Sequence, residues 1–198
     1  MNSIQLYFIT LSLFVSFSLL AQYESLNQND FIKLTTLKEE ISLDENFDYD
    51  LVNVGVMHFT NIYRQSKNRN LLSYNINLEK SASLHSAEMK KYNFFDHINR
   101  RNKNLKDLDD RADEAAYEKY SELSENLYYG YIDLRNIATY EELIKTIVKA
   151  FQDSKPHNEN LLNKDLKEMG ASIVFKNNSE DGFLYYYVTQ SFGTRFTF

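Results

Sequence analysis

The sequence predicts an α+β fold in which helices cover a small antiparallel sheet. Two observations carry this prediction. Apolar residues recur at helical spacing through much of the chain. Two strand-like runs then close it, Met169 to Lys176 and Phe183 to Phe192, and the polar turn between them indicates an antiparallel hairpin. Helices interspersed with a few antiparallel strands favour layers in which helices pack on the sheet.

The composition indicates a folded domain with a full hydrophobic core. The chain has 198 residues, of which 43% are hydrophobic and 15% aromatic, so it is not disordered. The net charge of −6 argues against a nucleic-acid partner, because phosphate contacts require clustered Lys and Arg. Cysteine is absent, which excludes both disulfides and a lipid-modified N-terminal cysteine.

The N-terminal stretch is typical of an export signal. Ile4 to Leu20 is an uncharged apolar run, short for a membrane span, and no basic stop-transfer cluster follows it. We interpret residues 1–21 as a signal peptide cut after Ala21. No stable membrane span would then remain, and the protein would be secreted, periplasmic or at the cell surface. An uncleaved N-terminal anchor is the alternative.

The rest of the chain is expected to form an extension and a domain. Residues 22–50 are polar and acidic and predict an N-terminal extension, with a short helix over Phe31 to Ile41. Residues 51–198 are expected to form the domain. Its first helix has an apolar face from Val52 to Tyr63, where apolar residues stand at i, i+4, i+7 and i+11.

The middle of the domain is expected to contain further helices and a strand. Asn77 is the predicted N-cap of the second helix. A short helix over Asp107 to Glu118 and a strand over Tyr120 to Tyr131 should follow. One stripe of the second helix consists of Leu78, Ala82, His85, Met89 and Tyr92.

The last helix should begin at a capping box and end before the only proline. The hydroxyl of Thr139 can accept from a backbone amide while Glu142 reaches back to the cap. Pro156 removes a backbone donor and disfavours the α region for the residue before it, so the helix should stop near Ser154. His157 is then expected on a rigid, exposed corner.

The four histidines differ in their surroundings. We expect His58 at the surface or its boundary and His85 as a hydrogen-bonded core residue. His97 and His157 both lie in predicted loops at helix ends, and Glu125 enters a strand between them. Two His and one Glu from separate loops can converge on one pocket, and these ligand types suit Zn²⁺. Spacing alone does not establish such a site.

Four short segments, taken in order, resemble one known family. They are Asn93-Phe94-Phe95-Asp96-His97, similar to N-F-x-x-H; Ser124-Glu125-Asn126-Leu127, similar to G-E-N-[LI]; Ala150 to Leu162, similar to A-W-x-x-S-x-x-H-x-x-N-[IL]-L; and Met169-Gly170-Ala171 with Tyr187 to Gly193, which ends in Q-x-F-G. Together they resemble the CAP superfamily of cysteine-rich secretory proteins, antigen 5 and pathogenesis-related proteins, and in particular its cysteine-free bacterial SCP-like branch.

The resemblance implies a three-layer α-β-α sandwich with a solvent-accessible central cavity. In many members two His and two Glu line that cavity and can hold a divalent metal. Matched by position, His97, Glu125 and His157 take three of these places, and the fourth falls on Ser154. The implied cavity is therefore lined by these four residues. Zn²⁺ or another divalent cation would be held by the two histidines and the glutamate.

The incomplete set of ligands allows several interpretations. Zinc with three protein ligands and an open position is typical of catalytic sites, and Ser154 could orient a metal-bound water. Alternatively, the His and Glu side chains simply hydrogen-bond one another in a polar cavity. A third hypothesis takes Ser154 as nucleophile, His157 as base and Glu125 as orienter, but no nucleophile-elbow pattern surrounds the serine.

Two functions stay open at this stage. One is a secreted bacterial binding protein whose cavity, or the aromatic surface of Tyr128-Tyr129 and Tyr185-Tyr186-Tyr187, holds a small molecule, a lipid or a protein. The alternative is a metal-assisted or general-base hydrolase that acts on cell-envelope or extracellular substrates. Its candidate catalytic residues are Glu125, Ser154 and His157.

Overall fold

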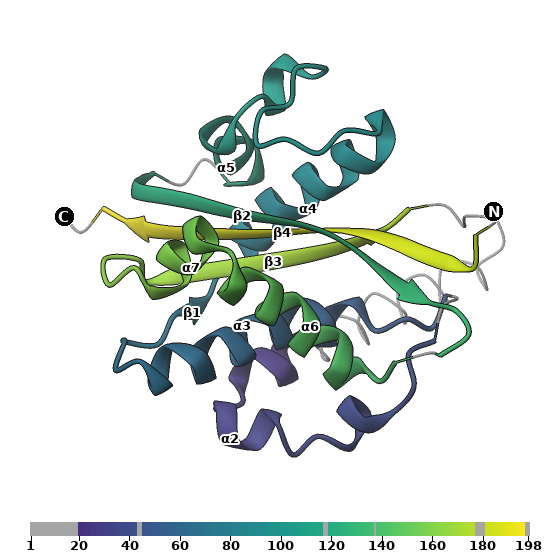
Figure 1. Cartoon of the computed structure of the whole chain (residues 1–198). Coiled ribbons are helices and arrows are strands. Elements are labelled where there is room, and N and C mark those ends of the chain that lie inside the picture. Colours follow the sequence, from purple (N-terminus) through teal and green to yellow (C-terminus); the bar gives the residue numbers. More distant parts are fainter. Residues whose placement is uncertain (1–19, 43–44, 117–118, 137, 177–180, 197–198) are drawn as a thin grey trace, which may run out of the picture.

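The computed structural model describes residues 20–42, 45–116, 119–136, 138–176 and 181–196. It confirms the α-β-α arrangement. Helices α4 (Ile76–Tyr92) and α5 (Leu108–Ala116) lie on one face of a central sheet, and α3 (Tyr49–Ser66), α6 (Tyr140–Asp153) and α7 (Lys155–Leu162) lie on the other (Figure 1). The predicted signal peptide, residues 1–21, falls almost wholly outside the described residues.

The sheet has four strands in the order β1-β3-β4-β2. The predicted hairpin is confirmed as β3 (Glu168–Phe175) and β4 (Phe183–Arg195), which pair antiparallel, and β2 (Tyr120–Asp133) pairs antiparallel with β4. The two-residue strand β1 (Ser73–Tyr74) pairs parallel with β3. The sheet is therefore mixed, and its three long strands are antiparallel as expected.

The face below the sheet is closed by an apolar core. Helix α3 (Tyr49–Ser66) and helix α6 (Tyr140–Asp153) pack on each other and on the strands. The capping box of Thr139 and Glu142 is present at the start of α6, and the helix ends at Ser154 as predicted. Phe151, which takes the place of the family tryptophan, is fully buried on its inner face.

The second predicted helix, α4 (Ile76–Tyr92), lies across β3 and β4. Its N-cap is Asn75 rather than Asn77, because the chain is still extended at residue 75 and that side chain accepts from two amides of the first turn. Gly170 on β3 permits the close packing: a Cβ there would lie 2.1 Å from the backbone nitrogen of Glu79. Tyr92, at the end of the predicted buried stripe, is 37% exposed.

The N-terminal extension takes part in the main core. It contains α2 (Gln28–Phe31) and the 3-10 helix η1 (Thr35–Lys38) in place of the single predicted helix. Its buried side chains join the cluster beneath the sheet: Tyr23, Phe31, Leu37, Ile41 and Phe47. The domain boundary at residue 50 stays a prediction, but the segment before it packs into the core of the domain.

The prediction for His58 is wrong. This residue is 1% exposed, because the N-terminal segment covers it. The ring of Phe31 stacks on the imidazole at 4.1 Å, and Nε2 lies 3.0 Å from the carbonyl oxygen of Tyr23. An acidic segment with weak periodicity gave no sign that it would fold back over α3.

Among the described helices, none has both the length and the apolar character needed to span a membrane.

Candidate functional site

The site is built around Glu125, in the middle of β2. Side chains alternate between the two faces of a strand. Glu125 points to the face that carries α4 and α5, where it meets Arg111 of α5 (Leu108–Ala116). Asn126 points to the opposite face, where it donates to Gln190 of β4 at 3.1 Å. One motif therefore supplies a residue to each side of the sheet.

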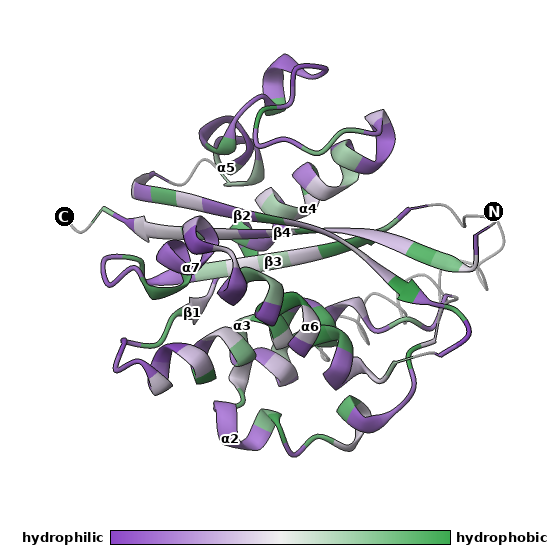
Figure 2. Cartoon of the chain, in the orientation of Figure 1, coloured by the Kyte–Doolittle hydropathy of each residue, from purple (hydrophilic) through white to green (hydrophobic). Residues whose placement is uncertain are grey.

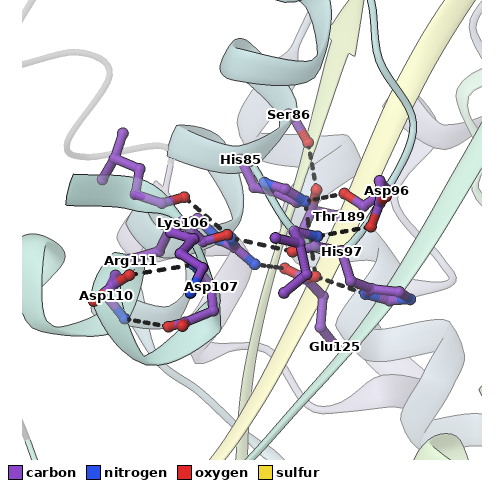
Figure 3. A network of polar contacts seen from close by, with 12 residues as sticks. His85, Ser86, Asp96, His97, Lys106, Asp107, Asp110, Arg111, Glu125 and Thr189 are labelled. Carbon is purple, nitrogen blue, oxygen red and sulfur yellow. Dashed lines mark hydrogen bonds and ion pairs between the residues drawn. The ribbon is translucent and has the colours of Figure 1, made fainter. Parts of the chain in front are cut away.

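Both carboxylate oxygens of Glu125 have partners (Figure 3). Nη2 of Arg111 donates to Oε2 at 2.8 Å, and Nδ1 of His97 lies 2.9 Å from Oε1. Nε2 of His85, on α4, is 3.8 Å from the same Oε1. Arg111 is fully buried and Glu125 is 8% exposed, so the pair is shielded from water.

The contacts explain how these groups ionise. Burial alone would raise the pKa of Glu125, but the hydrogen bond with His97 and the charge of Arg111 bring its pKa below the usual value. The same hydrogen bond raises the pKa of His97. Burial lowers the pKa of His85 to about 4, against the attraction of Glu125. Glu125 is therefore ionised, and His85 is a neutral core histidine, as predicted.

A pocket of about 310 Å³ opens beside this cluster. His97, Arg111 and Glu125 contribute to its wall, and Asp107 and Asp109 stand at the start of α5. The remaining wall residues are Ile98, Leu108, Leu123 and Ser124. The side chain of His97 is 53% exposed, so it is the member of the cluster that solvent or a ligand can reach.

Among the described residues, the side chains of His157 and Ser154 make no hydrogen bond with the polar cluster, and they do not line its pocket. The expectation of an exposed loop at His157 is wrong. The chain resumes a helix, α7 (Lys155–Leu162), because the fixed φ of Pro156 suits a first helical turn. The imidazole packs edge-on against Phe151 at 5.5 Å, and its backbone carbonyl accepts from Asn126. Ser154 is the junction between α6 and α7.

The structure thus brings together two of the four predicted cavity residues. His97 and Glu125 are in contact and line the pocket, whereas Ser154 and His157 are not among its wall residues. Burial and the positive charge of His97 both lower the pKa of His157, so the two imidazoles interact electrostatically. The serine-nucleophile arrangement finds no support in these contacts and stays a prediction.

The cluster does not fit a bound divalent metal as it stands. Among the described residues, no three His, Cys, Asp or Glu side chains are grouped so that they could hold one. Glu125 already accepts from a guanidinium and an imidazole, and Nδ1 of His97 is engaged. Metal binding by His97, Glu125 and His157 therefore stays a prediction that this geometry does not support.

Sequence reasoning missed Arg111. It is the only basic residue between Asp107 and Glu118, and in sequence it looks like part of a solvated acidic helix. Its head group instead reaches inward to a strand that begins several residues later. A single arginine inside an acidic run, close before a motif glutamate, was the available signal.

Comparison with known proteins supports the fold. The sequence model of the CAP group, described as the cysteine-rich secretory protein family, matches residues 57–192, well over half of the chain. No curated protein is significantly similar to it.

Solved bacterial structures show the same architecture. An extracellular protein with an SCP domain from Bacillus anthracis matches with a TM-score of 0.55 and 22% identity; the match covers 74% of this chain and 41% of that protein. An outer surface protein of Borrelia burgdorferi matches with a TM-score of 0.53 and 20% identity, over 71% of this chain and 90% of that one. A cysteine-rich secretory protein of Staphylococcus aureus matches with a TM-score of 0.50 and 19% identity; the match covers 76% of this chain and 40% of that protein.

Proposed function

The chain belongs to the CAP family of cysteine-rich secretory proteins, and from this premise we propose that it is an exported bacterial domain that binds a small polar ligand against His97. The observation that carries the proposal is the His97–Glu125–Arg111 cluster in the wall of a pocket. Glu125 contacts the imidazole at Nδ1, and Nε2 has no hydrogen-bond partner among the described residues, so a ligand can meet it there.

The size and lining of the pocket favour one class of ligand. A volume of about 310 Å³ is at the lower end for small-molecule sites. Asp107 and Asp109 line the same pocket as His97, so a molecule with hydroxyl or amine donors suits this wall. Lipid and protein ligands remain less suited to this pocket than a small polar compound.

Native mass spectrometry of the protein purified from its own host tests this proposal. A copurifying small molecule should be retained by the native protein and lost in His97→Ala and in Asp109→Asn. Lys145→Ala is a matched control, because Lys145 lines a separate groove between α3 and α6. A ligand that stays bound in His97→Ala would contradict the proposed site.

Export rests on separate support. Two of the similar structures are described as an extracellular and an outer surface protein, and the chain begins with an uncharged apolar run. N-terminal sequencing of protein from the medium or the periplasm should begin at Gln22. Recovery of an intact Met1 in the membrane fraction would favour the anchor instead.

The general-base hydrolase is a second candidate, favoured by the 2.9 Å contact between His97 and Glu125. A carboxylate that orients an imidazole is the arrangement of many general bases. In that case His97 would take a proton at Nε2, and Glu125 would hold the ring. Hydrolysis of envelope material should then persist in the presence of a chelator and be lost in His97→Gln; loss upon chelation would point to a metal-assisted reaction.

A further inference from the structure

Arg111 places a positive charge beside the carboxylate of Glu125 in the wall of this pocket. Its side chain is fully buried, and Nη2 donates to Glu125 at 2.8 Å. Arginine keeps its charge in proteins, and its planar head group is suited to carboxylates. The negative charge of Glu125 is therefore already balanced from within the chain.

The guanidinium has further contacts in the loop before α5. Nη1 lies 3.4 Å from three backbone carbonyl oxygens there, those of His97, Leu105 and Lys106, while Nε has no hydrogen-bond partner among the described residues. The head group thus joins β2 to the loop that carries His97. Displacing it would leave both a buried carboxylate and several carbonyls without their donor, which is costly.

A divalent ion at Glu125 would have to share this carboxylate with the guanidinium. Two like charges at such distances repel strongly in a poorly solvated site. The third expected ligand does not offset this repulsion, since the imidazole of His157 packs on Phe151 and no three ligand residues are grouped for a metal among the described residues.

We propose that Arg111 is the resident cation of this site and takes the charge-balancing role that a divalent metal would otherwise have. Glu125 then acts as the anchor of His97 rather than as a metal ligand, and the pocket works without metal. This inference concerns the same pocket as the proposed function, but it does not depend on whether a ligand binds there.

Zinc titration by calorimetry of the purified secreted protein tests it, with His97-dependent binding as the readout. The native protein should show no such binding at micromolar zinc. Arg111→Met and Arg111→Gln, which remove the charge, should bind zinc roughly tenfold or more tightly than the native protein. Adding His97→Ala to either variant should abolish the gain.

Two results would overturn the proposal. One is micromolar zinc binding by the native protein that His97→Ala removes. The other is a folded Arg111→Met or Arg111→Gln variant that gains no affinity for zinc, because charge would then not be what excludes the metal. Arg111→Gln retains hydrogen-bond donors and is the variant better able to fold. If neither variant folds, the titration of the native protein decides alone. The two proposals can also fail separately. A copurified ligand that stays bound in the presence of a chelator would support the proposed function whatever the zinc titration shows.

Discussion

Two shielded glutamates near α4 have opposite environments. Glu125 contacts the guanidinium of Arg111 and the imidazole of His97. Among the described residues, Glu79 in the first turn of α4 accepts side-chain hydrogen bonds only from neutral groups, the hydroxyl of Tyr74 and, at 3.4 Å, the amide of Asn53. The pKa of Glu125 is lowered, whereas burial raises the pKa of Glu79 to about 7.

The difference shows that partners, rather than burial, decide whether a carboxylate is ionised in this fold. Glu125 is the more buried of the two groups, yet it keeps its charge. The hydrogen bond from Tyr74 lowers the pKa of Glu79, but the negative charges of Asp50 and Glu24 act with burial to raise it. Helix α5 lies in a largely hydrophilic region of the chain (Figure 2). Its Arg111 nevertheless donates to Glu125, and this contact helps to keep the carboxylate ionised.

The largest expected effect is that of Glu125→Gln. It leaves Arg111 buried without a counter-charge, so the free energy of unfolding should fall by about 3–5 kcal/mol at pH 8. Urea denaturation followed by circular dichroism measures this. A loss below about 1 kcal/mol would mean that Arg111 is not shielded as the structure describes.

Glu79→Gln should have the opposite sign and depend on pH. Between pH 4.5, the usual pKa of the side chain, and about 7, folded Glu79 holds a proton that the unfolded chain releases. The stability that Glu79 contributes is therefore complete below pH 4.5 and lost as the pH rises through 7. At pH 8, Glu79→Gln should be more stable than the native protein by on the order of 2 kcal/mol.

The same pair of proteins provides the control at low pH. Well below pH 4.5 their free energies of unfolding should be equal, because Glu79 is then protonated in both the folded and the unfolded state and is neutral, like the glutamine. Burial lowers the pKa of His58 and that of His85, so acid destabilises both proteins alike and cancels in the difference. A constant difference across the range would show that Glu79 does not titrate there.

Tyr74→Phe should have a smaller effect on the same carboxylate. It removes one hydrogen bond, which is worth about 1 kcal/mol. Since that bond lowers the pKa of Glu79, its loss should move the pH range of the stability change upward. Stability measured from pH 5 to 9 in both proteins tests this, and an unmoved midpoint would contradict it.

His97→Gln should have the smallest effect on stability. The imidazole is half exposed, so its ion pair with Glu125 contributes at most about 1 kcal/mol. The comparison with Glu125→Gln separates the two roles within the site, since Arg111 stabilises the fold and His97 faces the ligand. Thermal unfolding of both variants gives the measurement; a larger loss in His97→Gln than in Glu125→Gln would reverse this assignment.

The sequence predicted most of the fold because its motifs are short-range. The capping box of Thr139, the helix end at Ser154 and the hairpin each depend on neighbouring residues. The hydrogen bond between His97 and Glu125 was one of the open alternatives, and the structure confirms it. By contrast, the burial of His58 and the inward turn of Arg111 depend on segments that meet only in the folded chain.

The surroundings of His157 depend on the alternation of side chains along β2. The motif residues Glu125 and Asn126 are adjacent in sequence, but the alternation of side chains sends them to opposite faces. Helix α7 binds on the side of Asn126, through the side chain of Asn160 at 2.9 Å. In the fold the backbone carbonyl of His157 accepts from the side chain of Asn126, and the place of its imidazole in a cavity with Glu125 stays a prediction.

The position of β4 in the sheet also has a consequence for biosynthesis. β4 is the last described strand along the chain, yet it is the neighbour of both β3 and β2. Until β4 has been made, β2 has no partner in this sheet, and Gln190 is not there to join Asn126 to Thr60 of α3. The sheet can therefore become complete only after β4 has been synthesised, so its assembly depends on contacts between segments far apart in the sequence.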